Sequence, residues 1–189
     1  MKNLDKLLTA SKFKNWLACK FTTINEIKKL EDPKVSKKTF SKTEEIRKQR
    51  GDEFEEKIYK EFIKDYSNHI KIKKDKDSLK NTKEALKKGY DLIHKAHFEY
   101  DGWSGEIDFL IKGENGYEVY DTKLTTMPKP EHIIQICIYT EWLKIMRSGL
   151  LPEKMHLILG DKKNTVSYKV RDYQLYFQRN KAKYLDFLS

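Results

Sequence analysis

Three residues that could form a phosphodiesterase centre, Asp108, Asp121 and Lys123, lie within sixteen positions of one another. Magnesium is often held by one or two carboxylates, and water and substrate phosphate complete its octahedron. A lysine beside the ion can polarise the attacking water or offset the charge that develops on the phosphate. These residue types therefore favour metal-dependent hydrolysis of a phosphodiester bond, provided that the fold brings the three side chains together.

The surrounding sequence predicts a β-hairpin that would do so. Residues 105–112 and 117–124 are rich in β-branched and aromatic residues, and a Gly-Glu-Asn-Gly segment joins them. A four-residue loop of this composition is typical of a hairpin. If residue 112 pairs with residue 117, antiparallel pairing places Asp108 opposite Asp121. Strand alternation then puts Lys123 on the same face as Asp121.

Two carboxylates in opposed positions repel each other unless a cation or a proton neutralises them. The alternative interpretation is a solvent-facing hairpin edge with ordinary surface charges. Against that alternative, Leu110 and Val119 share the face of the two aspartates. A face with such residues is partly buried, and buried carboxylates require partners.

The rest of the chain predicts the elements that hold this hairpin. Residues 9–30 have the apolar spacing of one amphipathic helix, with Ser11 as its N-cap and Phe21 on its apolar side. Ser41 and Glu44 have the spacing of a capping box and open a helix to about residue 66. The core stripe expected on that helix comprises Ile46, Phe54, Ile58 and Phe62. Gly51 inside it suggests a kink or the close approach of another segment.

Strand patterns follow at 92–100, 155–159 and near 166–170, and helices are expected at 131–148 and 172–188. This order predicts an α/β fold in which helices flank a mixed sheet. We expect one nuclease domain over residues 1–189, with a mostly helical, basic part at 1–89 and the catalytic sheet and its helices at 90–189.

The charge distribution indicates a polyanionic partner. The chain has a formal net charge of +10, and residues 1–100 contain 26 Lys and Arg against 17 Asp and Glu. An excess of lysine in one half suits contacts with phosphates. Lysines outnumber arginines 34 to 5, which favours binding without sequence preference. The alternative is that genomic base composition alone favours lysine. The lysine-rich run at 71–88 is either a solvated surface or part of a DNA channel.

Cysteine content and hydropathy exclude several classes of protein. The two cysteines, Cys19 and Cys137, cannot form a disulfide scaffold or a four-thiolate cluster, and we expect two buried thiols. No apolar run reaches the length of about 18 residues that a membrane span needs. Residues 1–10 contain no apolar stretch long enough for a secretion signal. We therefore expect a cytoplasmic protein without a membrane partner.

Four segments resemble the motifs of the PD-(D/E)XK nuclease superfamily, specifically its RecB-like branch. Gly105-Glu106-Ile107-Asp108-Phe109 and the segment 117–124, with Asp121-Thr122-Lys123, match the catalytic motifs. Residues 135–139 match the Gln-x-x-x-Tyr signature of that branch. Gly51-Asp52-Glu53-Phe54-Glu55 is similar to its first motif, a Gly followed four residues later by an acidic residue or His. Ile107 stands where the superfamily name has Pro.

The resemblance implies further site residues and a core fold. It implies a restriction-endonuclease-like core of about four strands and cleavage of DNA with Mg²⁺ or Mn²⁺. By position, Asp108 and Asp121 would be metal ligands, Glu55 a third ligand and Lys123 the catalytic lysine. Gln135 and Tyr139 would line the site from the later helix. Without the resemblance, Glu55 would be a solvated acid, and Gln135 and Tyr139 a polar seam beside core residues.

Iron–sulfur members of the superfamily have a cysteine near the place of Cys19 and three more near the C-terminus. This chain has only Cys137 besides, so we expect no cluster. The expected function is a DNA nuclease, an exonuclease in repair, recombination or replication that works with a helicase or another repair or replication protein. The alternatives are a site-specific or structure-specific endonuclease and a non-catalytic DNA-binding subunit.

Overall fold

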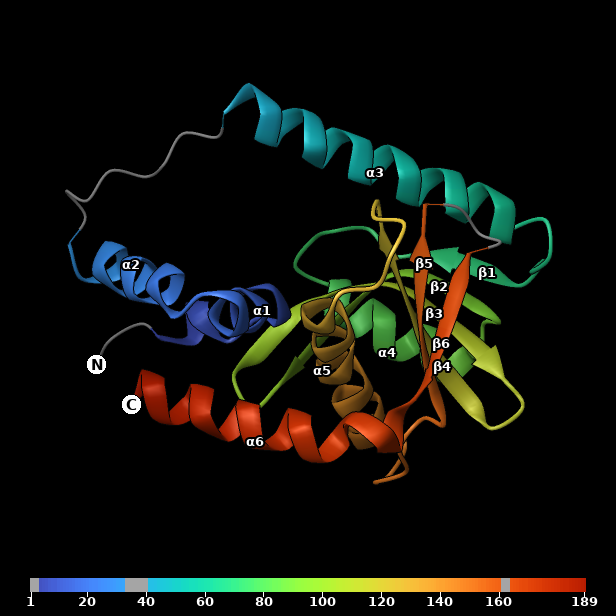
Figure 1. Cartoon of the computed structure of the whole chain (residues 1–189). Helices are drawn as coiled ribbons and strands as arrows, with labels where there is room; N and C mark the ends of the chain where they lie inside the picture. Colours follow the sequence, from blue (N-terminus) through green and yellow to red (C-terminus); the bar gives the residue numbers. More distant parts are fainter. Residues whose placement is uncertain (1–3, 33–40, 161–163) are drawn as a thin grey trace.

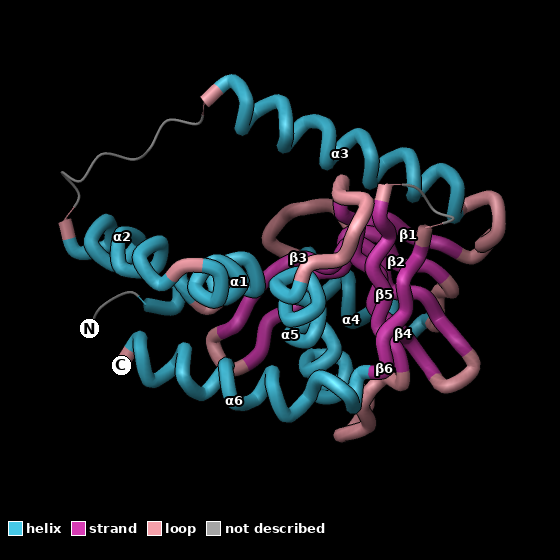
Figure 2. The backbone as a smooth tube through the Cα atoms, viewed as in Figure 1, coloured by secondary structure: helices cyan, strands magenta, loops and turns pink. Residues whose placement is uncertain are grey.

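The computed structural model describes residues 4–32, 41–160 and 164–189, and a mixed sheet with helices on both faces dominates it (Figures 1 and 2). A short 3₁₀ helix, η1 (Leu4–Leu7), precedes the first α-helix. The helices are α1 (Ala10–Ala18), α2 (Lys20–Glu31), α3 (Lys42–Phe62), α4 (Ser78–Lys88), α5 (Pro130–Met146) and α6 (Val170–Leu188). The strands are β1 (His69–Lys71), β2 (Leu92–Tyr100), β3 (Trp103–Gly113), β4 (Gly116–Lys123), β5 (Lys154–Leu159) and β6 (Thr165–Lys169).

The six strands form one sheet in the order β1-β2-β3-β4-β5-β6. The β1–β2 and β4–β5 pairs are parallel, and the other neighbours are antiparallel. The predicted α/β class with a mixed sheet flanked by helices is confirmed. The expected count of about four strands is too low. One added edge strand, β1, has three residues and adjoins the lysine-rich run, where the sequence shows no strand alternation.

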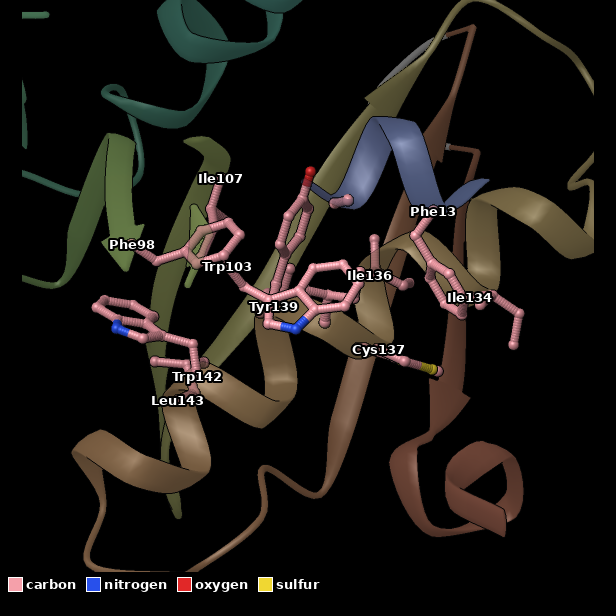
Figure 3. Packing of buried hydrophobic residues seen from close by; sticks show 14 of the residues in the cluster. Phe13, Phe98, Trp103, Ile107, Ile134, Ile136, Cys137, Tyr139, Trp142 and Leu143 are labelled. Carbon is pink, nitrogen blue, oxygen red and sulfur yellow. The ribbon is translucent and has the colours of Figure 1, made fainter. Parts of the chain in front are cut away.

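The two faces of the sheet bury separate cores. On one face α3 packs Phe54, Ile58 and Phe62 against residues of β2, β3 and β5. On the other face α1, α5 and α6 cover the larger core, part of which Figure 3 shows around Phe13 and Trp103. Figure 1 shows α3 along one side of the sheet and α5 and α6 on the other. The helices α3 and α1 therefore pack on opposite faces of the same sheet.

The predicted helix at 9–30 is two helices. The chain leaves helical geometry at Cys19, whose backbone is extended at φ −160° and ψ 109°. Thr9, not Ser11, is the N-cap of α1, and its hydroxyl accepts from the N–H of Lys12. Phe21, expected in the core, is 72% exposed, because the break rotates α2 out of the apolar register of α1. Cys19 is exposed as well, so the expectation of two buried thiols holds for Cys137 alone.

The long helix α3 begins as expected, with the reciprocal capping box of Ser41 and Glu44. It ends at Phe62, four residues before the predicted boundary. Ile46 does not belong to the core stripe, since 51% of it is exposed. The close approach that Gly51 suggested is also absent, because a Cβ built on Gly51 would meet nothing within 4 Å among the described residues. The first half of α3 extends beyond the sheet that its second half covers.

Replacing Gly51 with alanine should therefore stabilise the protein. A helical glycine costs roughly 0.5–1 kcal/mol relative to alanine, and the added methyl group meets no neighbour here. We expect the free energy of unfolding in urea to rise by about that amount with an unchanged m value. Gly89→Ala is the opposite case, because Gly89 has φ +75° and should cost about 1 kcal/mol when replaced. A destabilised Gly51→Ala variant would show that α3 has a contact at this point.

The C-terminal helix holds the N-terminal helix in place. The hydroxyl of Tyr184 donates to the carbonyl of Leu7 at 2.8 Å. The ring of Phe13 lies 5.3 Å from that of Tyr184 and 6.2 Å from that of Phe177. The start of α1 is thus fixed by residues more than 160 positions away in the sequence. Within the described ranges, no helix is long and apolar enough to cross a membrane.

Candidate active site

A cleft of about 490 Å³ lies where α1, α3, α5 and the centre of the sheet meet. Gly51 and Asp52 of α3 form part of one wall, and Thr9 to Ser11 at the start of α1 form part of another. The cleft is lined by all six residues that the sequence singled out, namely Glu55, Asp108, Asp121, Lys123, Gln135 and Tyr139. These six residues come from four elements, α3, β3, β4 and α5, and share one cavity.

Asp108 stands where β3 separates from both neighbouring strands. The hairpin register is the predicted one, with Lys112 paired to Tyr117, but the ladder ends at Phe109 and Tyr120, one pair before Asp108 and Asp121. The β2–β3 ladder also omits the position of Asp108, between its pairs at Phe109 and Ile107. The freed carboxylate oxygen Oδ2 accepts from the N–H and the hydroxyl of Thr122 at 2.7 and 2.6 Å. These two bonds orient Asp108 toward the cleft.

Asp121 and Lys123 form a buried ion pair beside Asp108. Asp121 is only 2% exposed, and the Nζ of Lys123 donates to its Oδ2 and to the carbonyl of Thr122. Burial raises the pKa of Asp121 to about 6; the charge of Lys123 opposes this rise and that of Asp108 adds to it. Burial disfavours the charge of Lys123, but Asp121 and Asp108 outweigh it, so the pKa of Lys123 is raised. Both carboxylates therefore favour the charged form of Lys123, but among the described residues only Asp121 pairs with it.

This donor set fits a divalent cation. Asp108 Oδ1 has no hydrogen-bond partner within the described part of the chain, and it belongs to a carboxylate that lines the cleft. The buried Asp121 carboxylate is destabilised in its charged form, which a second positive charge would relieve. In the residues that the structure describes, no three His, Cys, Asp or Glu side chains are grouped closely enough to hold a metal ion. Two aspartates and water are the arrangement that magnesium commonly takes.

Glu55 is neither a solvent-exposed acid nor grouped with the aspartates as a third ligand. It is buried, and its Oε1 lies 2.7 Å from His94 Nε2 while its Oε2 accepts from Lys95 Nζ at 2.5 Å. His94 is held between the rings of Tyr59 and Phe109, at 4.3 and 4.8 Å. Both carboxylate oxygens of Glu55 therefore have partners, and a metal at Glu55 would have to displace Lys95 or His94.

Gln135 and Tyr139 lie one turn apart on α5 and reach the cleft together. Gln135 Nε2 donates to the Tyr139 hydroxyl at 2.9 Å. Figure 3 shows the Tyr139 side chain rising from α5 toward α1. Burial and then the charge of Asp121 raise the pKa of Tyr139 well above its ordinary value. The hydroxyl of Tyr139 is therefore neutral, and it is close enough to Asp121 to be affected by the charge of that carboxylate.

Sequence reasoning passed over four residues that shape this site. His94 was set aside as structural, and Lys95, Thr122 and Lys14 were not considered. Lys95 bridges Glu55 and Glu106, the latter at 2.9 Å, and has the left-handed φ of +61°. Strained backbone in residues other than glycine often occurs at functional sites. One feature could have indicated that Lys95 belongs to the site. Once the register of β2 and β3 is known, Lys95 falls opposite Asp108.

Replacing Glu55 with glutamine should lower stability, and it should also lower metal affinity because Lys95, which interacts with Asp108, loses a negatively charged partner. The change leaves Lys95 with Glu106 alone and weakens the partner of a buried histidine, at a cost of roughly 1–3 kcal/mol in unfolding free energy. Some cleavage should persist at high manganese, because Asp108 and Asp121 remain. Glu56→Gln is the matched control: Glu56 is the next residue, and its exposed pair with Lys71 contributes less than about 1 kcal/mol. Equal effects of the two variants on stability and on metal binding would remove Glu55 from the site.

A comparison of the chain with models of known protein families finds no match, and a comparison with curated proteins finds no significantly similar sequence.

Proposed function

We propose that the protein is a Mg²⁺- or Mn²⁺-dependent deoxyribonuclease that hydrolyses phosphodiester bonds. One observation carries the proposal: Asp108, Asp121 and Lys123 share one cleft, in which Lys123 pairs with Asp121 and one carboxylate oxygen of Asp108 has no partner among the described residues. The resemblance of these residues, and of Glu55, Gln135 and Tyr139, to the motifs of RecB-like nucleases supports the same reaction. The lysine excess of residues 1–100 supports DNA as the substrate.

The residues have distinct roles in this proposal. Asp108 and Asp121 hold the divalent ion, which when bound supplies Lewis-acid activation of the phosphate and of water. Thr122 fixes Asp108, so one carboxylate oxygen stays directed at the cleft. Lys123 stabilises the negative charge that develops on the phosphate oxygens and helps to orient the attacking water. The neutral Tyr139 hydroxyl and the amide of Gln135 orient the substrate.

Within this class we favour an exonuclease that acts on DNA ends or single strands. The chain contains five arginines, and the described elements form one sheet with its covering helices, without an added module for reading base edges. Such an enzyme would act in repair, recombination or replication beside a helicase or another protein of those processes.

A digestion assay tests the proposal. Purified protein with Mg²⁺ or Mn²⁺ should degrade labelled linear DNA and leave covalently closed circles intact, whereas an endonuclease would cut both. EDTA should stop the reaction. In Ca²⁺, which should support binding without turnover, affinity for DNA should fall steeply as salt rises. DNA binding that is insensitive to salt, with no cleavage in either metal, would overturn the proposed function.

A further inference from the structure

The part of the cleft wall that the start of α1 forms is held in place by contacts with β3. The N–H of Ser104, in β3, donates to the carbonyl of Leu8 at 3.0 Å, and Thr9 is bridged to Ser104 as in a parallel pair. Thr9 also caps the helix through the N–H of Lys12. These contacts fix the direction of the first turn relative to β3, the strand that contains Asp108.

The first turn of α1 offers hydrogen-bond donors to the cleft. Ser11 lines the cleft, and neither its N–H nor its hydroxyl has a hydrogen-bond partner among the residues described. The turn contains no acidic residue. The N-terminus of a helix has a partial positive charge, and its free N–H groups favour an anion.

Lys14 adds a full positive charge to the same helix face. It lies three residues after Ser11, so the two side chains are neighbours on the helix surface. Lys14 is half-buried and has no ion pair within the described ranges; burial and then the charge of Lys123 lower its pKa. Lys12, two residues earlier, is instead paired with Glu26 at 3.0 Å. The charges of Asp121 and Glu131 oppose the lowering of the Lys14 pKa but do not offset it, so a further anion would favour the charged form of Lys14.

Gln135 is the second sign of a missing ligand. It is only 6% exposed, it lines the same cleft, and its Oε1 has no hydrogen-bond partner in the described parts of the chain. If the amide rotates by 180°, Tyr139 can donate to Oε1, and the amide N–H groups of Gln135 take the unpartnered position. In the present orientation the O–H of Tyr139 is the donor without a described acceptor. Either orientation leaves a buried donor for an acceptor group on a ligand.

We propose that Ser11 and Lys14 bind a second phosphate group of the DNA strand, adjacent to the phosphate that is hydrolysed at Asp108 and Asp121. This inference rests on the proposed function, in which the scissile phosphate occupies the sheet side of the cleft. A nucleic acid strand places further phosphates at regular intervals, so the anionic group that reaches the α1 wall is a phosphate of the same strand. Binding of this second phosphate determines which phosphodiester linkage lies at the metal ion.

The site can be located with single methylphosphonates, which remove the charge of one linkage at a time. We would measure binding in Ca²⁺ and cleavage in Mg²⁺ for single-stranded oligonucleotides substituted at successive linkages. With the wild-type protein, one linkage besides the scissile one should lose about tenfold in affinity, as expected for one charge-assisted contact. Lys14→Met should lose about the same factor on unmodified DNA and then be insensitive to the methylphosphonate at that linkage.

Lys12→Met is the matched control, since it removes the same charge from the same helix, but from a lysine that is already paired with Glu26. It should bind DNA within about twofold of wild type and keep the full sensitivity to every methylphosphonate. If Lys14→Met stays as sensitive as wild type at every linkage, or if Lys12→Met behaves like Lys14→Met, the site is wrong. Unfolding temperatures within about 2 °C of wild type would establish that both variants are folded.

A second measurement separates this inference from the proposed function. Inorganic phosphate titrated into the metal-free protein should shift the backbone amide resonance of Ser11 saturably in wild type and in Lys12→Met, but not in Lys14→Met. A protein that passes this test yet neither binds nor cuts DNA has the anion site and a different substrate. A protein that binds and cuts DNA but shows no saturable shift at Ser11 lacks the site.

Discussion

Replacing Lys123 with alanine should lower the rate of DNA cleavage by about 10²–10³-fold, the usual loss when one donor to a developing oxyanion is removed. Lys123 Nζ donates to Asp121, and the lysine lines the cleft together with Asp108 and Asp121. It therefore supplies charge where the phosphate becomes more negative. Single-turnover cleavage in Mg²⁺ measures the loss, and affinity for DNA in Ca²⁺ should stay within a few-fold of wild type.

The Lys123→Ala variant should also change the pKa of Asp121, and this change would not be expected if Lys123 had a purely structural role. The charge of Lys123 holds down the pKa of Asp121, so in metal-free Lys123→Ala this carboxyl should titrate above pH 6. Carbon NMR of the aspartate carboxyl groups would detect the change. Lys112→Ala is the control, because Lys112 is an exposed lysine of the same hairpin and does not line the cleft. Full cleavage by purified Lys123→Ala protein would refute the mechanism.

Asp121→Asn should abolish cleavage and remove the stabilisation that divalent metal gives to the protein. A ligand at 100 times its dissociation constant stabilises the folded state by about 2.7 kcal/mol. Asp121 is one of two carboxylates available for that interaction, so neutralising it should eliminate most of the effect. Thermal unfolding with and without Mg²⁺ at pH 7.5 measures this. Asp172→Asn, a change at an exposed acid on α6, should keep the full metal-induced shift.

The pH dependence of the metal-free protein tests the same residue. Asp121 has a pKa of about 6 in the folded state against 3.8 for the free group, so the folded protein holds this proton more tightly. Stability should therefore fall as pH rises from about 4 to about 7, by on the order of 3 kcal/mol in total. Added metal should restore it at pH 7.5 and do little at pH 5. If Asp121→Asn shows the same decline, another group is responsible.

The structural features that could be predicted from the sequence were those that depend on neighbouring residues. The hairpin register follows from four loop residues and from alternation, and the capping box at Ser41 needs only the four successive positions from Ser41 to Glu44. Phe54, Ile58 and Phe62 were placed correctly in the core, because their spacing of four residues puts them on one face of a helix. In contrast, the break at Cys19 has no glycine or proline to indicate it.

The departures inside the site have a different cause. Asp108 leaves the β3–β4 ladder where β3 is also unpaired with β2, and the sequence of the hairpin alone contains no information about β2. The partners of Glu55, His94 and Lys95, are 39 and 40 positions away. Such pairings depend on how α3 crosses the sheet. The types of the site residues could be read from the sequence, but their hydrogen-bond partners could not.

The contact between Tyr184 and Leu7 has a consequence for biosynthesis. These residues are separated by 177 positions, and the aromatic contacts of Phe13 with α6 span a similar distance. Contacts between such distant residues can form only after the intervening chain has been made. While the ribosome still holds α6, the α1 wall of the cleft lacks its support. A nascent chain therefore cannot assemble the whole cleft, and the proposed nuclease activity would appear only after α6 has emerged.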